Sequence, residues 1–455
     1  MVEMFADLLP GLMFLALIVA LFSGAPVAVM LMGVSLIFGI IAILIGEMRL
    51  IHATLIPNRI FGGTIENPVL VAAPMFIFMG LVMERTRIAE DLLLTLQRLL
   101  RVVPGGLGLA VVLMGTILAA ATGIIGASVV MLTVLALPTM LSGGYRPSLA
   151  AGTVASAGTL GILIPPSIML VFMGDLLSVS IGRLFMSALL PGLVLSALYV
   201  LFITLYSAAR PEVAPKAPPL PPEERDGLFL QTVVALLVPI ALITMVLGSI
   251  LGGIATPTEA AGVGAVGALL LGALRGRLTP KVLFDSADGS VRTVAMLFFI
   301  FVGATAFSYI FKKIGGDAFL VETAQSLALG DWGLLFAMMV MIFAMGFFFD
   351  WIEITLIVLP IFAPIVAIMD LGDHVARGDL VYWFAVLVAV NLQTSFLTPP
   401  FGFALFYLKG AAGNLVSMGV IYRGIIPFVV LQLIVLALAI TFPDLVLWLP
   451  RALSN

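Results

Sequence analysis

The sequence predicts an all-α polytopic membrane protein. Apolar residues make up 62% of the 455 residues and charged residues only 10%, whereas soluble domains carry about 25% charged residues. Apolar runs long enough to cross a hydrocarbon core of about 30 Å recur along the chain. They lack the strict alternation of a membrane barrel. Because each segment in a bilayer must satisfy its own backbone groups, we expect these runs to be helices.

The composition excludes several classes of function. The chain has no cysteine, and its two histidines, His52 and His374, are too isolated to form a metal site. A net charge of −3 does not indicate a nucleic-acid partner. No glycine-rich nucleotide-binding signature opens a helix after a strand. We therefore expect no catalytic residues, no enzymatic activity and no bound cofactor.

A single polar segment divides the chain. Residues 207–230 are rich in proline and charge and are interpreted as an aqueous linker that is partly extended. The linker separates a first half, residues 1–206, from a second half, residues 231–455. We expect each half to be one copy of an internal repeat.

Matching prolines support the repeat. Pro26 and Pro257 each begin a predicted helix near the start of a half, and they lie 231 residues apart. A doubled proline occurs late in each half, at Pro165–Pro166 and at Pro399–Pro400, and these pairs lie 234 residues apart. Two pairs of proline landmarks separated by nearly the same number of residues favour an internal repeat over a chance match.

The distribution of positive charge indicates that the repeat is inverted. Residues 84–104 and 275–292 each contain four basic residues, whereas their counterparts, about 312–331 and 46–62, are less basic or more acidic. Basic segments face the cytoplasm. The two basic segments should therefore lie inside and the N-terminus outside. The first of them is also amphipathic, so an interfacial helix is an alternative to a span.

The doubled prolines predict broken helices at about 150–173 and about 381–410. Proline lacks an N–H, so the carbonyl four residues earlier loses its helical partner. We expect exposed carbonyls at Gly161 and Ile162, and at Ser395 and Phe396. Carbonyl and hydroxyl oxygens are suitable ligands for Na⁺, and broken helices at matched positions mark transporter sites. The alternative is a structural kink. Hydroxyl side chains flank both breaks: Thr159, Ser167, Thr394, Ser395 and Thr398.

Each broken helix is preceded by a predicted re-entrant hairpin. Residues 105–141 and 333–369 are apolar runs interrupted midway by glycine or charge. Asp350 and Glu353, at the second interruption, are expensive in a bilayer and indicate a functional site, unless the tip reaches water. Glu259, by contrast, follows Thr256-Pro257-Thr258 and is expected to stabilise a helix start.

Cations near the apolar core are few. Lys312, Lys313 and Lys409 are candidates to bind a substrate carboxylate. The alternative for each is that its ammonium group extends to the lipid headgroups.

At these residues the chain resembles the large membrane subunit of tripartite ATP-independent periplasmic (TRAP) transporters. The resemblance covers most of the chain. It rests on three segments: Thr256-Pro257-Thr258-Glu259-Ala260-Ala261, Gly158-Thr159-Leu160-Gly161-Ile162-Leu163-Ile164-Pro165-Pro166-Ser167, and Asn391-Leu392 with Leu397-Thr398-Pro399-Pro400-Phe401-Gly402.

The resemblance implies a Na⁺-coupled symporter of the bacterial inner membrane. It implies an inverted-repeat, elevator-type fold, in which two re-entrant hairpins and two broken helices form a mobile transport domain. It implies a small partner subunit of about four helices and a periplasmic solute-binding protein. The usual substrates of the family are organic acids, including dicarboxylates, 2-oxo acids and sialic acids.

The resemblance also implies site residues. Each hairpin tip and its broken helix would enclose one Na⁺, and the substrate would lie between the two sites. The sodium candidates are Thr122, Gly123, Ser128, Ser156, Gly158, Thr159, Gly161, Ile164, Gly346, Asp350, Gln393, Thr394, Ser395 and Thr398. The substrate candidates are Ser128, Pro166, Ser167, Asp350, Glu353, Pro400 and Lys313.

Two other functions are compatible with parts of the pattern. A Na⁺/carboxylate symporter that works without a binding protein would share the broken helices. An intramembrane enzyme is a remote alternative, because the chain has neither a His-Glu-x-x-His motif nor a Gly-x-Ser-x-Gly motif. Asp175 is the only loose candidate to join Asp350 in an aspartyl pair.

Overall fold

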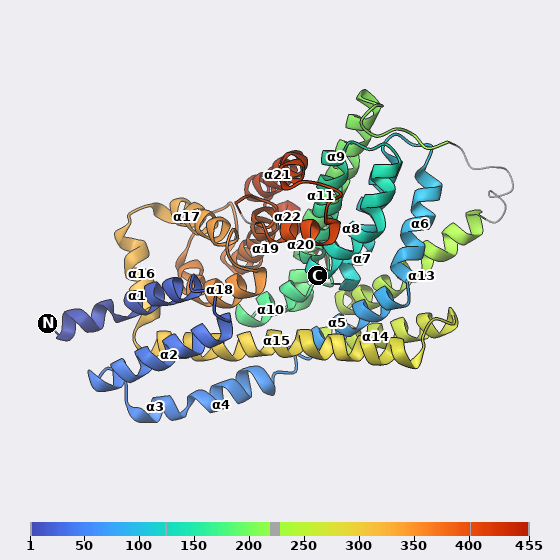
Figure 1. The fold of residues 1–455 in the computed structure, drawn as a ribbon. Helices are drawn as coiled ribbons and strands as arrows, with labels where there is room; N and C mark the ends of the chain where they lie inside the picture. The colour runs from blue at the N-terminus through green and yellow to red at the C-terminus, as the bar shows by residue number, and fades with distance from the viewer. Residues whose placement is uncertain (1, 123–124, 219–227, 401, 454–455) are drawn as a thin grey trace.

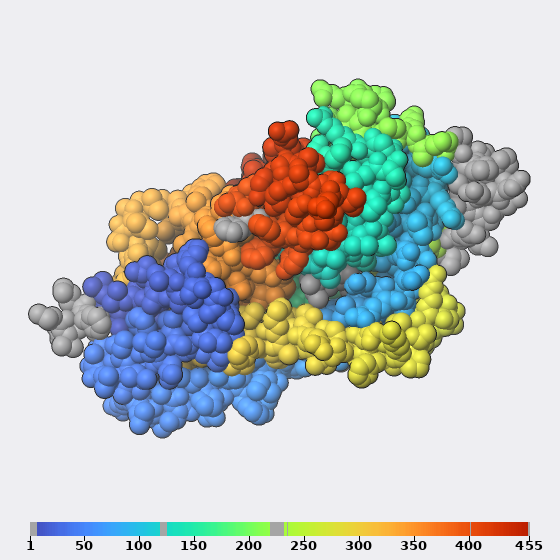
Figure 2. All heavy atoms as spheres, in the orientation of Figure 1, coloured from blue at the N-terminus to red at the C-terminus, as the bar shows by residue number. Residues whose placement is uncertain are grey.

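The computed structural model describes residues 2–122, 125–218, 228–400 and 402–453. In this part of the chain all regular secondary structure is helical. One long helix, α15 (Pro280–Lys313), runs along the lower part of the view in Figure 1, with α3 and α4 below it and the C-terminal helices above it. The C-terminal helices, red in Figure 2, lie against the teal helices of the first half, so the two halves form one body.

The described part of the first half contains eleven α-helices and two short turns of other helical types. In order they are α1 (Val2–Leu21), α2 (Val27–Leu44), α3 (Leu50–Thr54), α4 (Ile56–Ile60), a π-helical turn (Phe61–Ile65), α5 (Ala72–Arg85), α6 (Ile88–Leu100), α7 (Gly106–Thr122), α8 (Ile125–Ser142), α9 (Pro147–Thr159), a 3₁₀ turn (Leu160–Ile162), α10 (Ile168–Leu176) and α11 (Ile181–Ala209).

The second half begins after the linker. In order its helices are α13 (Leu228–Leu251), α14 (Pro257–Leu274), α15, α16 (Gly316–Ser326), α17 (Gly330–Met345), α18 (Trp351–Ile368), α19 (Arg377–Ser395), α20 (Phe403–Ala412), α21 (Met418–Thr441) and α22 (Asp444–Leu453).

Seven of the described helices are long and apolar enough to cross a membrane. An eighth span results if α16 and α17, which meet at an angle of 116°, are counted as one bent element. Large apolar side chains such as Leu44, Leu274 and Val340 are exposed on their surfaces, as expected of helices that face lipid rather than water.

The order of helices repeats between the halves. The helices that follow the first proline landmark, α2 and α14, each pack against the helix that precedes the hairpin region of the other half: α2 packs on α15, and α14 packs on α5. This exchange of partners is what two copies related by a twofold operation produce.

Both predicted breaks are present. The helix α9 ends at Thr159 and α10 begins at Ile168, while α19 ends at Ser395 and α20 begins at Phe403. The Pro165–Pro166 and Pro399–Pro400 bonds are cis. Hairpins α7–α8 and α17–α18 precede the two broken helices and contact them. The fold prediction of two hairpins and two broken helices is thus confirmed.

The start of α14 confirms the structural role expected for Glu259. The Thr256 hydroxyl accepts a hydrogen bond from the Glu259 N–H, and the Glu259 carboxylate accepts one of 2.8 Å from the Thr256 N–H. Such a capping box satisfies two N–H groups that the helix itself leaves unpaired. Loss of the cap costs about 1 kcal/mol.

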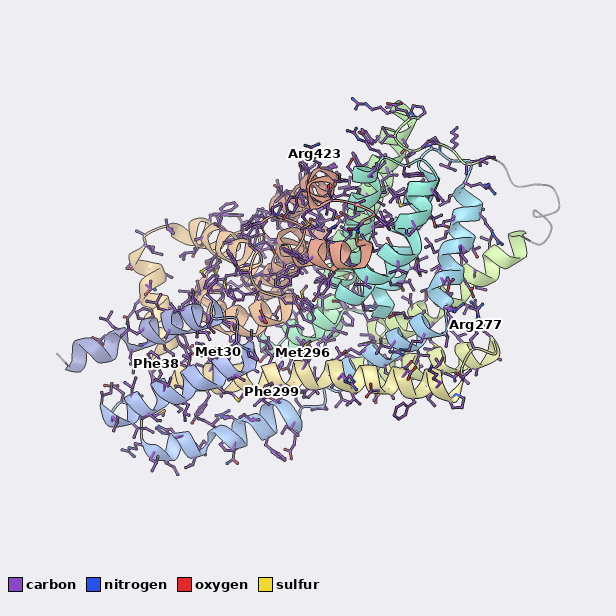
Figure 3. All side chains as sticks on the ribbon, viewed as in Figure 1. Met30, Phe38, Arg277, Met296, Phe299 and Arg423 are labelled. Carbon is purple, nitrogen blue, oxygen red and sulfur yellow. The ribbon has the colours of Figure 1, made fainter. Side chains whose placement is uncertain are left out.

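Ion pairs join the two basic segments at one end of the molecule. The Asp91 carboxylate in α6 lies 2.7 Å from Arg275 and 2.8 Å from Arg277, and Figure 3 shows Arg277 at the bend between α14 and α15. Arg85 lies 3.5 Å from Asp285. Segments 84–104 and 275–292 therefore lie on the same side, as their shared basic character predicts.

A second ion-pair cluster lies where α11, α19 and α22 meet. The Asp379 carboxylate accepts hydrogen bonds from Arg183 and, at 3.0 Å, from Arg451. The Arg183 guanidinium also lies 4.6 Å from the centre of the Tyr382 ring. The start of α19 is thereby fixed to the C-terminal helix.

Candidate functional site

The first hairpin touches the first broken helix where Gly158 faces Val129. A Cβ on Gly158 would lie 2.5 Å from Cγ2 and 3.0 Å from Cα of Val129, distances at which atoms overlap. Only glycine therefore lets α8 and α9 approach this closely. The contact sits one residue from Ser128, at the start of the α8 arm.

A small cavity lies beside this contact. Its volume is about 10 Å³, and the candidates Ser128, Gly158 and Gly161 are among its lining residues. This is about the space that one water molecule or a similarly sized ion requires. Gly123 and the Thr122 side chain, also sodium candidates, lie outside the described residues.

The two broken helices meet at residues that occupy equivalent positions. The Gln393 amide donates a hydrogen bond of 3.4 Å to the Thr159 hydroxyl, across 234 residues, which is the spacing of the doubled prolines. Thr159 in turn donates to the Ser156 carbonyl at 2.9 Å. Among the described atoms, the Ser156 hydroxyl and the Gln393 carbonyl oxygen are buried without a hydrogen-bond partner. Unpartnered buried oxygen atoms are costly unless a ligand binds them.

The second hairpin approaches its broken helix even more closely. A Cβ on Gly346 would lie 1.9 Å from the Ser395 hydroxyl oxygen. Ser395 donates its proton to the Leu392 carbonyl at 2.8 Å, and Thr394 donates to Val390 at 2.9 Å. Thr398 donates to the Thr394 carbonyl at 2.8 Å. Each hydroxyl uses its proton on the helix, so its lone pairs remain to accept a cation.

Two of the carbonyls expected to be exposed have partners. The Ile162 carbonyl accepts a hydrogen bond of 2.6 Å from the Ser167 hydroxyl. The Ser395 carbonyl accepts one of 3.0 Å from the Thr398 N–H. The expectation was wrong for these two because it considered only the lost helical donor, whereas a local hydroxyl and a tight turn replace that donor. Gly161 and Phe396 remain as candidates.

A cavity of about 80 Å³, here called the central chamber, lies between the two hairpin tips. The first residues of four helices line it, and α15 closes one side. The lining residues are Ile125 and Gly126 of α8, Ile168 of α10, Trp351 and Ile352 of α18 with Asp350 before it, Phe403 and Tyr407 of α20, and Thr293, Met296 and Leu297 of α15.

Four helix starts converge on the central chamber, and their dipoles favour an anion there, whereas the Asp350 carboxylate in the lining opposes it. Each helix N-terminus carries unpaired N–H groups and about half a positive charge, and such ends bind anions without a basic side chain. Among the described residues that line the chamber, none is lysine, arginine or histidine. The backbone at the helix starts is therefore the source of the attraction for an anion, and it acts against the charge of Asp350.

The acidic pair at the second tip forms a capping box. The Asp350 carboxylate accepts a hydrogen bond of 2.7 Å from the Trp351 N–H, and Glu353 accepts one of 3.2 Å from the Asp350 N–H. Both side chains are only partly buried. Asp350 and Glu353 are three residues apart, as are Thr256 and Glu259. This spacing is the sequence signal by which the cap could have been predicted.

The other substrate candidates lie away from the lining of the central chamber. Ser167 is fully buried and bonded to Ile162. Pro166 is buried beside it, whereas Pro400 is exposed and its carbonyl accepts a hydrogen bond from Tyr422. Ile164, a sodium candidate, packs against Gly192 of α11. Of the proposed substrate residues only Asp350 lines the chamber.

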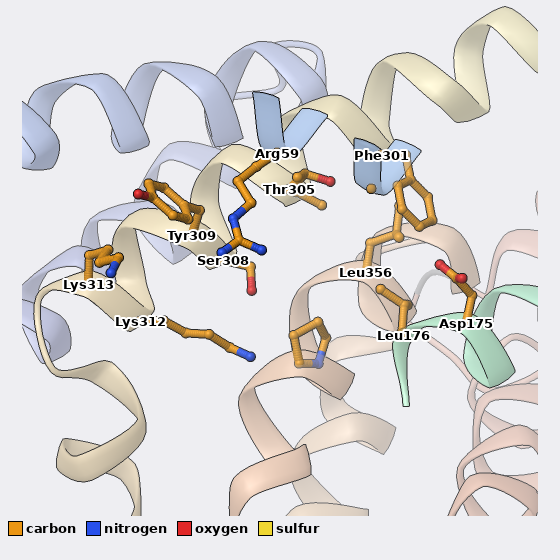
Figure 4. Close-up of a pocket in the computed structure, with 13 residues that line it drawn as sticks. Arg59, Asp175, Leu176, Phe301, Thr305, Ser308, Tyr309, Lys312, Lys313 and Leu356 are labelled. Carbon is orange, nitrogen blue, oxygen red and sulfur yellow. The ribbon is translucent and has the colours of Figure 1, made fainter. Parts of the chain in front are cut away.

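Lys313 lies in a different cavity, here called the basic pocket. This pocket has a volume of about 400 Å³ and lies between α15 and the hairpin region (Figure 4). Lys312 and Arg59 also line it. Sequence reasoning did not single out Arg59 as a site residue, because only the fold brings it beside the end of α15.

Comparison with known proteins gives the family. The family model described as the DctM component of the tripartite ATP-independent periplasmic transporter matches residues 14–445. The C4-dicarboxylate TRAP transporter large permease protein DctM of Pseudomonas aeruginosa is 31% identical, and the match covers 86% of this chain and 88% of that protein. The sialic acid TRAP transporter large permease protein SiaM of Vibrio cholerae is 29% identical, with 95% and 96% covered.

A solved structure agrees at the level of the fold. The YdaH transporter of Alcanivorax borkumensis superposes with a TM-score of 0.59 at 13% identity, and the match covers 88% of each chain. The relatives are permeases, and the described helices include seven that could cross a membrane. The chain therefore belongs to the DctM component family of TRAP transporters, and it is a multi-pass inner-membrane permease for secondary solute uptake rather than an enzyme.

Proposed function

We propose that the protein takes up a small organic acid together with Na⁺ by an elevator movement. The observation that carries the proposal is the convergence of four helix N-termini on the central chamber between the hairpin tips. A carboxylate placed there would interact with N–H groups at the starts of α10 and α20, which no side chain caps, and so with both halves at once. The same geometry explains how an anion can be bound where no basic side chain lines the described part of the cavity.

The proposed coupling ion is Na⁺. The cavity beside Ser128 and Gly158 supports one site, and the hydroxyl groups of Thr394 and Ser395 beside Gly346 support the other. An ion that joins a hairpin tip to a broken helix would also fix the helix starts that line the central chamber. Ion and solute would then each stabilise the state that the other needs, which is thermodynamic coupling.

The proposed mobile part consists of the hairpins and broken helices, α7–α10 and α17–α20. The remaining helices would form the scaffold, in which α2 packs on α15 and α5 packs on α14. Residues 1–206 and 231–455 would be the inverted repeats, with 207–230 as their linker. Inverted repeats can adopt each other's conformations. The same fold can therefore open the site to either side of the membrane.

The proposed substrate class is a carboxylate. The relatives described above are named for C4-dicarboxylates and for sialic acid, both of which carry carboxyl groups. The tripartite architecture of the family supports two partners for this chain: a small membrane subunit and a periplasmic solute-binding protein.

The proposal is tested by uptake into proteoliposomes. The panel of solutes is acetate, lactate, pyruvate, succinate and glutamate, each offered with an inward Na⁺ or K⁺ gradient, and with or without the binding protein. We expect uptake of at least one acid that requires Na⁺ and the binding protein. Uptake without the binding protein would indicate a stand-alone symporter. Uptake that is equal in Na⁺ and K⁺ would refute the coupling.

A further inference from the structure

The basic pocket contains more positive charge than its surroundings neutralise. The Arg59 guanidinium lies next to Ser308 at the wall of the pocket, and Lys312 reaches across it (Figure 4). In the described part of the chain every ion pair lies elsewhere, so neither cation has a carboxylate within 4.0 Å. Like charges that share one cavity repel each other, and an anion would relieve that repulsion.

An aromatic ring, that of Tyr309, contacts two of the cations in the basic pocket, Arg59 and Lys313. The Arg59 guanidinium lies 5.8 Å and the Lys313 ammonium 5.9 Å from the centre of the Tyr309 ring. Such contacts orient a cation without cancelling its charge. Lys313 also borders a separate cavity lined by acidic residues, including Glu47 and Glu322. The positive charge of the basic pocket that no acidic neighbour offsets is therefore that of Arg59 and Lys312.

The wall of the basic pocket opposite Lys312 includes Asp175, which links α10 to the segment before α5. Asp175, at the end of α10, accepts a hydrogen bond of 2.7 Å from Asn67, which precedes α5. Figure 4 shows Asp175 on the opposite side of the pocket from Lys312 and Lys313. Among the described lining residues, Asp175 is the single acidic group. It is already hydrogen-bonded, and it leaves the cationic wall open to a ligand.

The same three helices line the basic pocket and the central chamber. The helix α10 contributes Ile168 to the chamber and Asp175 to the pocket, and α18 contributes Ile352 and Leu356 respectively. The helix α15 likewise extends from the chamber to the pocket. At 1.5 Å per residue, the two cavities are about 5–10 Å apart along these helices. The pocket lies toward the end that the charge distribution places outside.

We propose that the basic pocket is a waiting site for the carboxylate of the incoming solute, on its path from the periplasm to the central chamber. The proposal rests on the organic-acid uptake proposed above. Arg59 and Lys312 would attract the anion, and the Ser308 hydroxyl would donate a hydrogen bond to it. A cleft lined by one sign of charge raises the local concentration of the opposite ion and so raises the association rate.

The test uses the absence of cysteine from the chain. Ser308→Cys is made in the full-length protein, which is placed in phosphatidylcholine nanodiscs with any membrane subunit that co-purifies. The rate of modification is measured with anionic and cationic methanethiosulfonate reagents. We expect the anionic reagent to react about tenfold faster, since such a field raises on-rates by at least this factor. The preference should vanish when Arg59→Gln and Lys312→Gln are added.

The ligand is identified by testing which acid protects the Ser308→Cys variant from modification. The five acids of the uptake panel are added at millimolar concentration, and at least one should slow the modification of the Ser308→Cys variant severalfold. Ser326→Cys is the matched control, because Ser326 is exposed at the end of α16 and does not line the pocket. Neither the reagent preference nor the protection should appear at position 326.

Uptake gives a second readout. Lys312→Gln should raise the KM for the transported acid about fivefold with little change in the maximal rate, as expected when an attractive charge on the approach path is lost. Lys281→Gln, at the other end of α15, is the control and should change neither value.

Three results would overturn the proposal. One is equal reactivity of the two reagents at position 308. Another is protection by added phosphatidylglycerol but by no acid, which would make the pocket a lipid headgroup site. The third is uptake of an acid that gives no protection, which would refute the waiting site while leaving the proposed function intact. Protection without any uptake would instead refute the proposed function.

Discussion

The absence of a side chain at Gly346 sets how closely the second hairpin approaches its broken helix. The Ser395 hydroxyl occupies the position that a Cβ would need. We predict that Gly346→Ala displaces the tip, lowers the stability by about 1–3 kcal/mol through overpacking, and reduces uptake. The measurements are thermal unfolding in detergent and initial uptake rates.

Gly262, in the middle of α14, is the matched control for this substitution. Apart from its chain neighbours and the adjacent backbone of α14, a Cβ at this position would have none of the described heavy atoms within 4 Å. Gly262→Ala should therefore leave uptake unchanged and raise stability by up to about 1 kcal/mol, because alanine is the better helix former. Equal effects of the two substitutions would show that the close contact at Gly346 is unimportant.

At the scale of the helical element, the cap at Asp350 separates a structural from a charge-dependent role. Asparagine caps a helix as well as aspartate does, whereas alanine does not. We predict that Asp350→Asn keeps stability within about 0.5 kcal/mol of the parent, and that Asp350→Ala costs about 1 kcal/mol. Thermal unfolding of both variants provides the measurement.

Uptake by the Asp350→Asn variant completes this test. If the carboxylate serves only to cap α18, as its bond to the Trp351 N–H suggests, the variant should transport at the parental rate. A large loss of uptake at unchanged stability would contradict the capping account and assign the charge to ion or solute binding. Thr256→Ala, which removes the cap of α14, is the control for cap loss away from the hairpins.

The elements of the fold could be predicted to a large extent, because proline acts locally. Pro165–Pro166 and Pro399–Pro400 each end a helix through the missing N–H, and no distant contact is needed to see this. The partners of the released carbonyls could not be predicted in the same way. Ser167 and the N–H of Thr398 reach those carbonyls only after the chain has turned.

The assembly of the candidate site was less predictable, because it depends on long-range packing. The central chamber is formed by the starts of helices from both halves, and the backbone N–H groups proposed to bind the anion have no sequence signature. For the same reason Arg59 could not be placed beside Lys312. Lys313, a candidate to bind the substrate, lines the basic pocket and not the central chamber, and its role stays a prediction.

At the scale of the whole molecule, the elevator proposal requires contacts between scaffold and mobile part to break during transport. Asn67 in the proposed scaffold donates to Asp175 in the proposed mobile part. We predict that cysteines at both positions, joined by oxidation or by Hg²⁺, stop uptake, and that reduction restores it. Uptake before and after cross-linking is the measurement.

A cross-link within the scaffold is the control. The hydroxyls of Thr64 and Thr305 lie 3.1 Å apart, and both residues belong to the proposed stationary part. Cysteines at these two positions should cross-link without stopping uptake. Continued uptake with Asn67 and Asp175 cross-linked would contradict relative movement of the two parts.

The most direct test of the account is the Na⁺ dependence of uptake when the hydroxyls at the two breaks are removed. Thr159→Val and Thr398→Val preserve side-chain shape, and Thr139→Val, at an exposed position with the same kind of bond to a helix carbonyl, is the control. We predict that each break variant raises the half-saturating Na⁺ concentration at least about tenfold, the equivalent of about 1.4 kcal/mol, while the control leaves it unchanged. An unchanged Na⁺ dependence in both break variants would contradict the assignment of the proline-broken helices as the cation sites.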